Sequence, residues 1–324
     1  MQTSLRRRES APAAKALLVC STGGHLTELL RIEAREGVNP DSMWVTFDTP
    51  QSRQMLTGRR VQYLPYVGPR DLKGTVAAVP SLSRIIRGEH FEAAVSTGAA
   101  IATAALPIAR MHGIPSTYIE SVCRIHGPST TGKLLSRVPG LELKTQHAGW
   151  AGGRWSMYPS ILDSFVSEER PAPATPLRVF VTLGTIRGYR FDSVVDAFLG
   201  TGLAGERTVW QLGDTKRTDP LPGTVHDYLS PDEFAREAAL ADVVITHAGV
   251  GTLVELLTMG VFPIQAIRRA SRDEHVDDHQ VQIAELVNHS GMGIAVEGPA
   301  LTAEIVELAA SRRVVDGSAI AGAA

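Results

Sequence analysis

The sequence predicts an α/β protein made of two Rossmann-like, doubly wound domains that face a cleft. Its 324 residues are about twice the usual size of one domain. Short apolar runs rich in β-branched residues alternate with helix-length segments, as in parallel sheets with crossover helices. Near the middle, residues 169–176 contain three prolines, which fit neither a helix interior nor a central strand.

The expected elements follow this alternation in both halves. In an N-terminal domain of residues 1–168 we expect strands near 16–20, 43–47, 61–64, 92–96 and 115–119, with helices between them such as 25–36 and 99–112. Residues 169–176 are the predicted hinge. In a C-terminal domain of residues 177–324 we expect strands near 177–182, 207–211, 242–246, 261–265 and 293–296. Its helices are expected near 190–200, 231–240, 250–259, 278–290 and 301–311, and its weakly patterned tail, 316–324, is expected to be frayed.

Composition and charge exclude several classes of protein. Hydrophobic residues make up 44% of the chain and charged residues 20%, which is typical of a globular protein. The net charge of −2 gives no electrostatic reason to expect a nucleic-acid partner. Two cysteines, Cys20 and Cys123, are too few for a disulfide framework, which favours a reducing cytoplasm. The arginines at 6–8 precede no apolar signal segment, and the uncharged run 93–109 contains Pro107, so we expect neither a signal peptide nor a membrane span.

The first of four unusual turns follows the first expected strand. Ligands of open α/β sheets bind beyond the carboxyl ends of the strands, where strands pass into helices. Here Gly23 and Gly24 let the backbone come close to a ligand, and the helix that starts near His25 favours an anion at its N-terminus. No G-x-G-x-x-G occurs, which argues against a dinucleotide-binding dehydrogenase. His25 is either a chemical residue or only a neighbour of the helix start.

The second and third turns lie in the same half. Thr97 and Gly98 follow the strand near 92–96, and Glu120 and Ser121 follow the strand near 115–119. A carboxylate at a strand end is costly unless it is paired or hydrogen-bonded. Glu120 is therefore a candidate functional residue, with the alternative that it pairs with Arg124 and shapes the loop.

The fourth turn, residues 246–255, is the most specific. A buried strand runs into Gly249 and Gly251, and the amides at this turn and the helix N-terminus suit a diphosphate. Glu255 falls one turn into the helix, where a carboxylate can accept hydrogen bonds from both ribose hydroxyls. The alternative is a tight turn with Glu255 on the surface. Asp277 and Gln280 could bind sugar hydroxyls, although alone they would indicate only a capped helix start.

The order of these turns resembles the GT-B glycosyltransferases of glycosyltransferase family 28 across nearly the whole chain. The first half resembles the acceptor subunit of the eukaryotic two-subunit dolichyl-diphosphate N-acetylglucosaminyltransferase at residues 21–25, 96–99, 118–121, 124 and 129–134. The second half resembles the donor-binding, catalytic subunit of that enzyme at residues 180–185, 247–252, 255 and 278–280. The chain is thus similar to a fusion of the two, as among bacterial exopolysaccharide transferases, and more distantly to MurG, which glycosylates a polyprenyl-diphosphate precursor of peptidoglycan. It departs from the acceptor subunit in lacking a membrane-anchoring helix, and residues 148–164 match no pattern of the family.

The resemblance implies a UDP-sugar site in the C-terminal half. The residues implied to hold the diphosphate are Gly184, Thr185, His247, Ala248, Gly249, Gly251 and Thr252. Tyr228 or Leu229 is implied near the base, Glu255 on the ribose, and Asp277 and Gln280 on the donor sugar. The residues implied on the acceptor side are Gly23, Gly24, Thr97, Gly98, Ser121 and Arg124.

The implied reaction is a direct displacement at the anomeric carbon with inversion. His25 matches the histidine of the family's N-terminal glycine turn and is the candidate base, with Glu120 as the second candidate. The chain contains no Asp-x-Asp, so we expect neither a metal nor a cofactor. The donor sugar stays open among glucose, galactose, N-acetylglucosamine and glucuronic acid, the last suited by Arg268, Arg269 and Arg272. The rival hypotheses are a UDP-sugar epimerase on the same fold and a non-catalytic nucleotide-sugar-binding partner of another transferase.

The expected acceptor is a polyprenyl-diphosphate-linked sugar, or another glycan, at the cytoplasmic face of the membrane. The aromatic segment 150–158, with Trp150, Trp155, Met157 and Tyr158, contains residue types favoured at membrane interfaces. Four basic residues could attract anionic lipid: Lys133, Arg137, Lys144 and Arg154. The alternative is that these aromatic side chains pack in the domain core.

Overall fold

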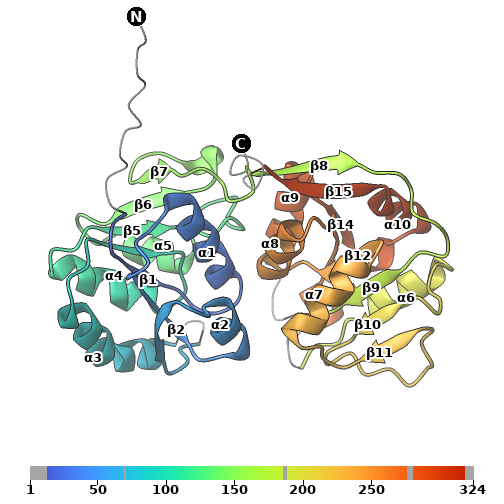
Figure 1. Cartoon of the computed structure of the whole chain (residues 1–324), viewed down its shortest axis with the longest axis horizontal. Helices are drawn as coiled ribbons and strands as arrows, with labels where there is room; N and C mark the ends of the chain where they lie inside the picture. Colours follow the sequence, from blue (N-terminus) through green and yellow to red (C-terminus); the bar gives the residue numbers. More distant parts are fainter. Residues whose placement is uncertain (1–12, 69–70, 185–187, 276–279, 318–324) are drawn as a thin grey trace, which may run out of the picture. The chain divides into compact units, whose positions relative to one another are not determined.

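The computed structural model describes residues 13–68, 71–184, 188–275 and 280–317. The chain divides into two compact units, Met1–Pro159 and Ser160–Ala324, each built on a parallel sheet with helices around it (Figure 1). The prediction of an α/β protein with two Rossmann-like sheets is therefore confirmed.

The sheet of the first unit has the order β3-β2-β1-β4-β5-β6-β7, and all its neighbouring strands are parallel. The strands are β1 (Ala16–Val19), β2 (Met43–Phe47), β3 (Arg60–Leu64), β4 (Ala93–Ser96), β5 (Ser116–Ile119), β6 (Glu142–Thr145) and β7 (Trp155–Met157). The helices are α1 (Gly24–Glu36), α2 (Pro50–Met55), α3 (Leu72–Gly88), α4 (Ala102–Met111) and α5 (Thr130–Leu135), and a 3₁₀ turn covers Ala148–Trp150. The five expected strands of this half are present.

The sheet of the second unit has the order β11-β10-β9-β12-β13-β14, again all parallel. The strands are β9 (Val179–Thr182), β10 (Val209–Gln211), β11 (Thr224–His226), β12 (Val243–His247), β13 (Ile264–Ile267) and β14 (Ile294–Glu297). The helices are α6 (Asp192–Gly200), α7 (Pro231–Leu240), α8 (Val250–Thr258), α9 (Gln280–Ser290) and α10 (Ala303–Ala310), with 3₁₀ turns at Ala270–Arg272 and Gly298–Ala300.

Alternation along β1 explains how the first helix is placed. Leu17 and Val19 face one buried cluster, and Leu18 faces the other, which contains Leu26 and Leu29 of α1. Because successive side chains of a strand point to opposite faces, β1 is covered on both sides. The packing of α1 against one face puts the N-terminus of α1 at the carboxyl end of β1.

The boundary between the units differs from the predicted hinge at 169–176. The chain passes into the second unit after Pro159, because β8 (Phe165–Glu169) pairs antiparallel with β15 (Arg312–Asp316) near the end of the chain. Arg170 is bound to the same unit through the carbonyl of Ala310. Asp316, expected in a frayed tail, instead ends β15, and residues 318–324 lie outside the described part of the chain. The pairing joins segments about 145 residues apart and carries many charges, so no local pattern indicated it.

Candidate functional site

His25 stands at the first strand-to-helix turn, in the first turn of α1. Its ring lies against Gly98, where an added Cβ would come within 2.9 Å of Cε1 of the ring, and Gly98 has a φ of +129°. The hydroxyl of Thr97 donates to the His25 carbonyl at 2.7 Å. The first two predicted turns therefore meet at His25, and the glycine at 98 is needed both for its backbone conformation and for the ring beside it.

The imidazole of His25 is neutral at physiological pH. Its pKa is lowered to about 4, chiefly by burial and in smaller part by the nearby charge of Arg124, while a hydrogen bond with the Thr97 backbone opposes the shift. Nδ1 is buried and has no hydrogen-bond partner in the described part of the chain. The ring can therefore accept a proton, as a general base must.

Glu120 is buried and its carboxylate is hydrogen-bonded on both oxygens. Oε1 accepts from the Tyr118 hydroxyl at 2.8 Å, and Oε2 accepts from the Ser129 amide at 2.8 Å and from its hydroxyl at 3.0 Å. Burial raises the pKa of Glu120. The described residues include no ion pair between Glu120 and Arg124, so the carboxylate shapes the loop through Ser129, which caps α5, and not through the arginine.

The loops around His25 contain three of the predicted acceptor-side residues, Gly23, Ser121 and Arg124. Gly23 has a φ of +77° and precedes α1 as an N-cap that has no side-chain hydrogen bond, and its amide donates to Gln51 Oε1 at 2.8 Å. The guanidinium of Arg124 is half-buried, and among the described residues it makes no hydrogen bond or ion pair. Its carbonyl accepts from Trp150 Nε1 at 2.8 Å, which fixes the loop. An uncapped helix N-terminus and an unpaired cation near His25 favour an anionic ligand.

Glu28 was not predicted from the sequence, although it belongs to this region. It is fully buried on α1, and its carboxylate accepts from the Ser121 hydroxyl, the Val122 amide at 3.1 Å and Gln146 Nε2 at 3.3 Å. Burial raises its pKa to about 7. It joins the helix that carries His25 to the loop that follows β5. A glutamate beside the apolar positions of α1 was the only local signal, and it did not identify the partners.

In the second unit, His247 occupies the turn between β12 and α8. Its ring lies between Gly184 and Gly249, where an added Cβ would meet the ring at 2.6 Å in each case, and Gly184 has a φ of +77°. The pKa of His247 is lowered to about 3. Burial is the largest cause, and the charges of Arg268 and His275 add to the shift. The two glycines therefore make room for a neutral histidine ring, a packing role that the sequence did not indicate.

The N-terminus of α8 has no side-chain cap. Gly249 is the N-cap, and among the described residues no side chain bonds to the first turn, in which Gly251 and Thr252 are half-buried. One turn on, Glu255 is half-buried, and burial raises its pKa. Within the described residues, the Glu255 carboxylate makes no hydrogen bond or ion pair. Unpartnered amides and an unpartnered carboxylate on consecutive turns suit a ligand with an anionic group beside a hydroxylated one.

Two other predicted donor residues, Tyr228 and Gln280, are already hydrogen-bonded within the protein. Tyr228 is exposed, and its hydroxyl donates to Asp214 Oδ1 at 2.6 Å, while Asp214 Oδ2 accepts from the Gly188 amide at 2.7 Å. Gln280 is buried and its Oε1 accepts from the Arg268 amide at 3.1 Å, so this oxygen is occupied by the backbone and not by a sugar hydroxyl. Thr185 and Asp277 lie outside the described residues.

The basic stretch 268–272 does not form an open cationic surface. Arg269 and Arg272 both pair with Glu297, at 2.5 and 3.1 Å, and Arg272 also pairs with Glu274 at 2.9 Å. Arg268 is buried. The suggestion that these three arginines suit a carboxylated sugar was therefore wrong, because carboxylates that come close only in the folded protein pair with two of them.

The aromatic segment 150–158 packs within its own unit and does not form an exposed anchor. Trp155 packs edge-on against Trp150 at 5.0 Å and against Tyr118 at 6.1 Å between ring centroids. Tyr158 is buried and donates to Glu36 Oε1 at 2.7 Å, and only Met157 is exposed. Packing within the unit accounts for three of these aromatics, as the alternative expected, and a membrane contact through the half-buried tryptophans stays a prediction.

No helix in the described part of the chain is long and apolar enough to cross a membrane. The described ranges also contain no group of three or more histidine, cysteine, aspartate or glutamate residues placed to hold a metal ion. The expectation of a metal-independent reaction stays a prediction.

Comparison with known families identifies the region that contains the α8 turn. Residues 223–310 match the model of the glycosyltransferase family 28 C-terminal domain. The matched segment contains Tyr228, the whole turn from His247 to Glu255, and Gln280, so most of the predicted donor residues lie in it.

Curated relatives extend the similarity beyond this domain. The UDP-N-acetylglucosamine--N-acetylmuramyl-(pentapeptide) pyrophosphoryl-undecaprenol N-acetylglucosamine transferase of Cupriavidus necator is 31% identical over 185 residues, 53% of this chain and 51% of the relative. The protein of the same name from Parasynechococcus marenigrum is 26% identical over 289 residues, 82% of this chain and 78% of the relative. The chain thus spans about half the length of the first relative and over three quarters of the second. Together with the family 28 domain, these relatives support the prediction of a glycosyltransferase.

Solved structures confirm the GT-B fold. Acinetobacter baumannii MurG matches 91% of this chain and 89% of its own, with a TM-score of 0.55 and 18% identity. The UDP-GlcNAc 2-epimerase of Methanocaldococcus jannaschii also matches, over 84% of this chain and 91% of its own, with a TM-score of 0.52 and 12% identity. Because an epimerase shares the fold, the fold alone does not separate transfer from epimerisation.

Proposed function

We propose that this protein transfers a hexose-type sugar from a UDP-sugar to an acceptor carried on a polyprenyl diphosphate, with inversion and without a metal. The observation that carries the proposal is the uncapped N-terminus of α8 followed by the unpartnered Glu255, both within the segment that matches the family 28 domain. The relatives named above act on a pyrophosphoryl-undecaprenol acceptor, which supports the acceptor class. A role in exopolysaccharide or glycoconjugate synthesis at the cytoplasmic face of the membrane is part of the same proposal.

In the proposed donor site, the amides at the start of α8 and the turn at Gly184 hold the diphosphate. The helix N-terminus stabilises the charge that develops on the β-phosphate as the sugar leaves. Glu255 accepts hydrogen bonds from the ribose hydroxyls. The exposed ring of Tyr228, whose hydroxyl is bound by Asp214, lies near the uracil of the nucleotide. A donor sugar bound in this way is activated by its leaving group.

On the acceptor side, His25 is the proposed base. Its neutral ring has a buried, unpartnered nitrogen, whereas every oxygen of Glu120 already accepts a hydrogen bond. His25 takes the proton of the acceptor hydroxyl as that oxygen attacks the anomeric carbon and UDP departs. Arg124 and the N-terminus of α1 are placed to attract the acceptor diphosphate. The likeness of the chain to a fusion of the two dolichyl-diphosphate transferase subunits belongs to this part of the proposal.

For contact with the membrane we propose the first turns of α3. Leu72 and Val76 are four residues apart on this helix and are 74% and 68% exposed. Tyr66, which lies beside Gly68 just before the helix, is 67% exposed. Lys73 is exposed among them and can attract anionic headgroups. Flotation of Leu72→Ser with anionic vesicles, compared with Met111→Ser on α4, tests this surface.

The test of the transfer activity compares two acceptors with each UDP-sugar in turn. We expect release of UDP with a short prenyl-diphosphate-sugar and little release with the same sugar lacking lipid and diphosphate. Equal rates with both would contradict the lipid-linked acceptor. Interconversion of the UDP-sugar without any acceptor would indicate an epimerase, and UDP binding without turnover would indicate a non-catalytic partner.

A further inference from the structure

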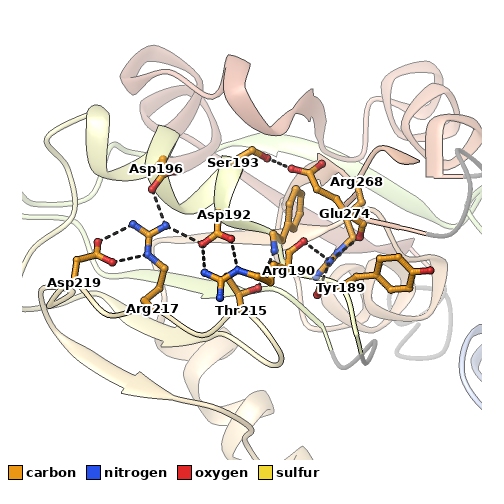
Figure 2. A network of polar contacts seen from close by, with 11 residues as sticks. Tyr189, Arg190, Asp192, Ser193, Asp196, Thr215, Arg217, Asp219, Arg268 and Glu274 are labelled. Carbon is orange, nitrogen blue, oxygen red and sulfur yellow. Dashed lines mark hydrogen bonds and ion pairs between the residues drawn. The ribbon is translucent and has the colours of Figure 1, made fainter. Parts of the chain in front are cut away.

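Arg268 follows β13 and is 1% exposed, an unusual place for a guanidinium. It donates to four backbone carbonyls, those of Leu183 at 2.7 Å, Glu274 at 3.0 Å, Arg190 at 3.3 Å and Tyr189 at 3.4 Å. Figure 2 shows Arg268 beside Tyr189, Arg190 and Glu274. These carbonyls belong to two loops, the one after β9 and the one after β13. One buried side chain therefore joins the carboxyl ends of two strands.

No described carboxylate contacts this guanidinium. Its Nε is buried and has no hydrogen-bond partner among the described residues, and its Cζ lies 4.5 Å from the centroid of the Phe191 ring. The nearest acid, Glu274, already accepts from the Ser193 hydroxyl (Figure 2), and it also accepts from the Arg269 amide and from Arg272. Burial lowers the pKa of Arg268 to about 10, which leaves it charged at neutral pH. A buried cation without a contacting anion is destabilising.

The surroundings of Arg268 are those of the proposed donor site. Leu183, whose carbonyl it binds, precedes Gly184. The amide of Arg268 is held by Gln280. The positive charge of Arg268 lowers the pKa of His247, after burial, so the charge is felt at the ring that lies between Gly184 and Gly249.

We propose that Arg268 is the buried cation of the donor site, which favours the nucleoside diphosphate by its charge and fixes the loops after β9 and β13 by its carbonyl bonds. The inference rests on the proposed function, because it assumes that a diphosphate binds at the N-terminus of α8. Arg268 is a positioning residue, since it is buried, binds the Leu183 carbonyl beside Gly184 and does not itself touch the ligand. It supplies positive charge that is felt at His247, and the unfavourable burial of that charge is offset when the dianion arrives.

The test separates the charge of the ligand from the rest of its binding. Affinities for UDP and for uridine are measured by calorimetry with the wild-type protein, Arg268→Met and Arg268→Lys. With Arg268→Met we expect UDP to bind at least about tenfold more weakly, because a unit charge is lost near the diphosphate, while uridine changes less than about threefold. With Arg268→Lys, which keeps the charge, we expect most of the preference for UDP over uridine to remain. Arg272→Met, which alters a partly exposed arginine of the same loop, is the matched control and should keep the wild-type preference.

Two results would overturn the inference. Equal losses for UDP and uridine in Arg268→Met would mean that the residue only supports the fold. Loss of the UDP preference in Arg268→Lys would mean that the charge is not what matters, and this variant also serves if Arg268→Met does not fold. If the wild-type protein binds no UDP, the proposed function itself fails, whereas UDP binding and transfer with an unchanged preference in Arg268→Met refute this inference alone.

Discussion

Replacing Glu255 with glutamine tests the donor site most directly. Glu255 is half-buried on α8 and its carboxylate has no partner among the described residues. Such a group is retained at a cost to folding, which is reasonable if it binds a ligand. Glutamine has nearly the same shape but no charge, so the change removes the carboxylate with little effect on packing.

The change should weaken UDP binding but should not lower the stability of the ligand-free protein. Hydrogen bonds from the ribose hydroxyls to a charged acceptor contribute about 1.5–3 kcal/mol, so we expect UDP to bind roughly 10–150-fold more weakly to Glu255→Gln. The stability of the ligand-free protein should be equal or higher. Burial raises the pKa of Glu255, so the folded protein keeps a proton that the unfolded chain has lost, and wild-type stability falls as the pH rises through the folded pKa. Glutamine does not titrate, and the stability difference should widen toward neutral pH.

Calorimetry with UDP and urea unfolding at pH 5 and pH 7 measure the two effects. The control is Glu307→Gln, which replaces an exposed glutamate on α10 of the same unit and should change neither the UDP affinity nor the stability toward urea. Unchanged UDP affinity in Glu255→Gln would remove Glu255 from the site. Weaker binding together with lower stability would mean that the carboxylate is structural.

Three further predictions concern other buried groups. Burial raises the pKa of Glu28 to about 7, so the contribution of Glu28 to wild-type stability should fall by about 3 kcal/mol between pH 4.5 and 7. Urea unfolding should show a flatter pH dependence in Glu28→Gln, and parallel curves would contradict the assignment. His25→Ala should lower turnover by about 10²–10⁴-fold without changing UDP affinity, and weaker UDP binding would exclude it as an acceptor-side base. Gly184→Ala should displace the His247 ring, which an added Cβ would meet at 2.6 Å, and weaken UDP binding. Gly188→Ala has a similar positive φ but an open Cβ position, so an equal effect of both changes on UDP would contradict this reason.

The fold was predictable because its central strands are apolar and short and the helices between them are regular. Buried strands such as β12 need apolar side chains on both faces, and that requirement is visible in the sequence. Four of the missed strands, β7, β8, β11 and β15, lie at sheet edges, and the fifth, β6, lies between β5 and β7 but is short and largely polar. β11 is three residues long and largely exposed, and β8 and β15 carry charges and pair across most of the second unit. Pairing of this kind depends on partners that are distant in the sequence.

The candidate site was predictable only as far as its turns. Glycines between a strand and a helix identified the positions of His25 and Glu255, because the backbone conformation there is local. The buried charges behind the turns were not identified. Glu28 contacts Ser121, 93 residues away, and Arg268 contacts Leu183, 85 residues away. Such contacts depend on the whole sheet order and have no signature in a short segment.

The pKa of His25 links the base to the chemistry of the acceptor. A base with a pKa of about 4 is neutral at pH 7 but weak, and part of its weakness comes from the charge of Arg124. A bound diphosphate neutralises Arg124 and favours the protonated ring, so it should raise the pKa of His25 as the acceptor binds. A neutral glycan acceptor has no such effect. We therefore expect the acidic limb of kcat/KM, which reports the free enzyme, near pH 4, and that of kcat with a lipid-diphosphate acceptor at higher pH. Coinciding limbs would mean that the acceptor diphosphate does not bind beside His25.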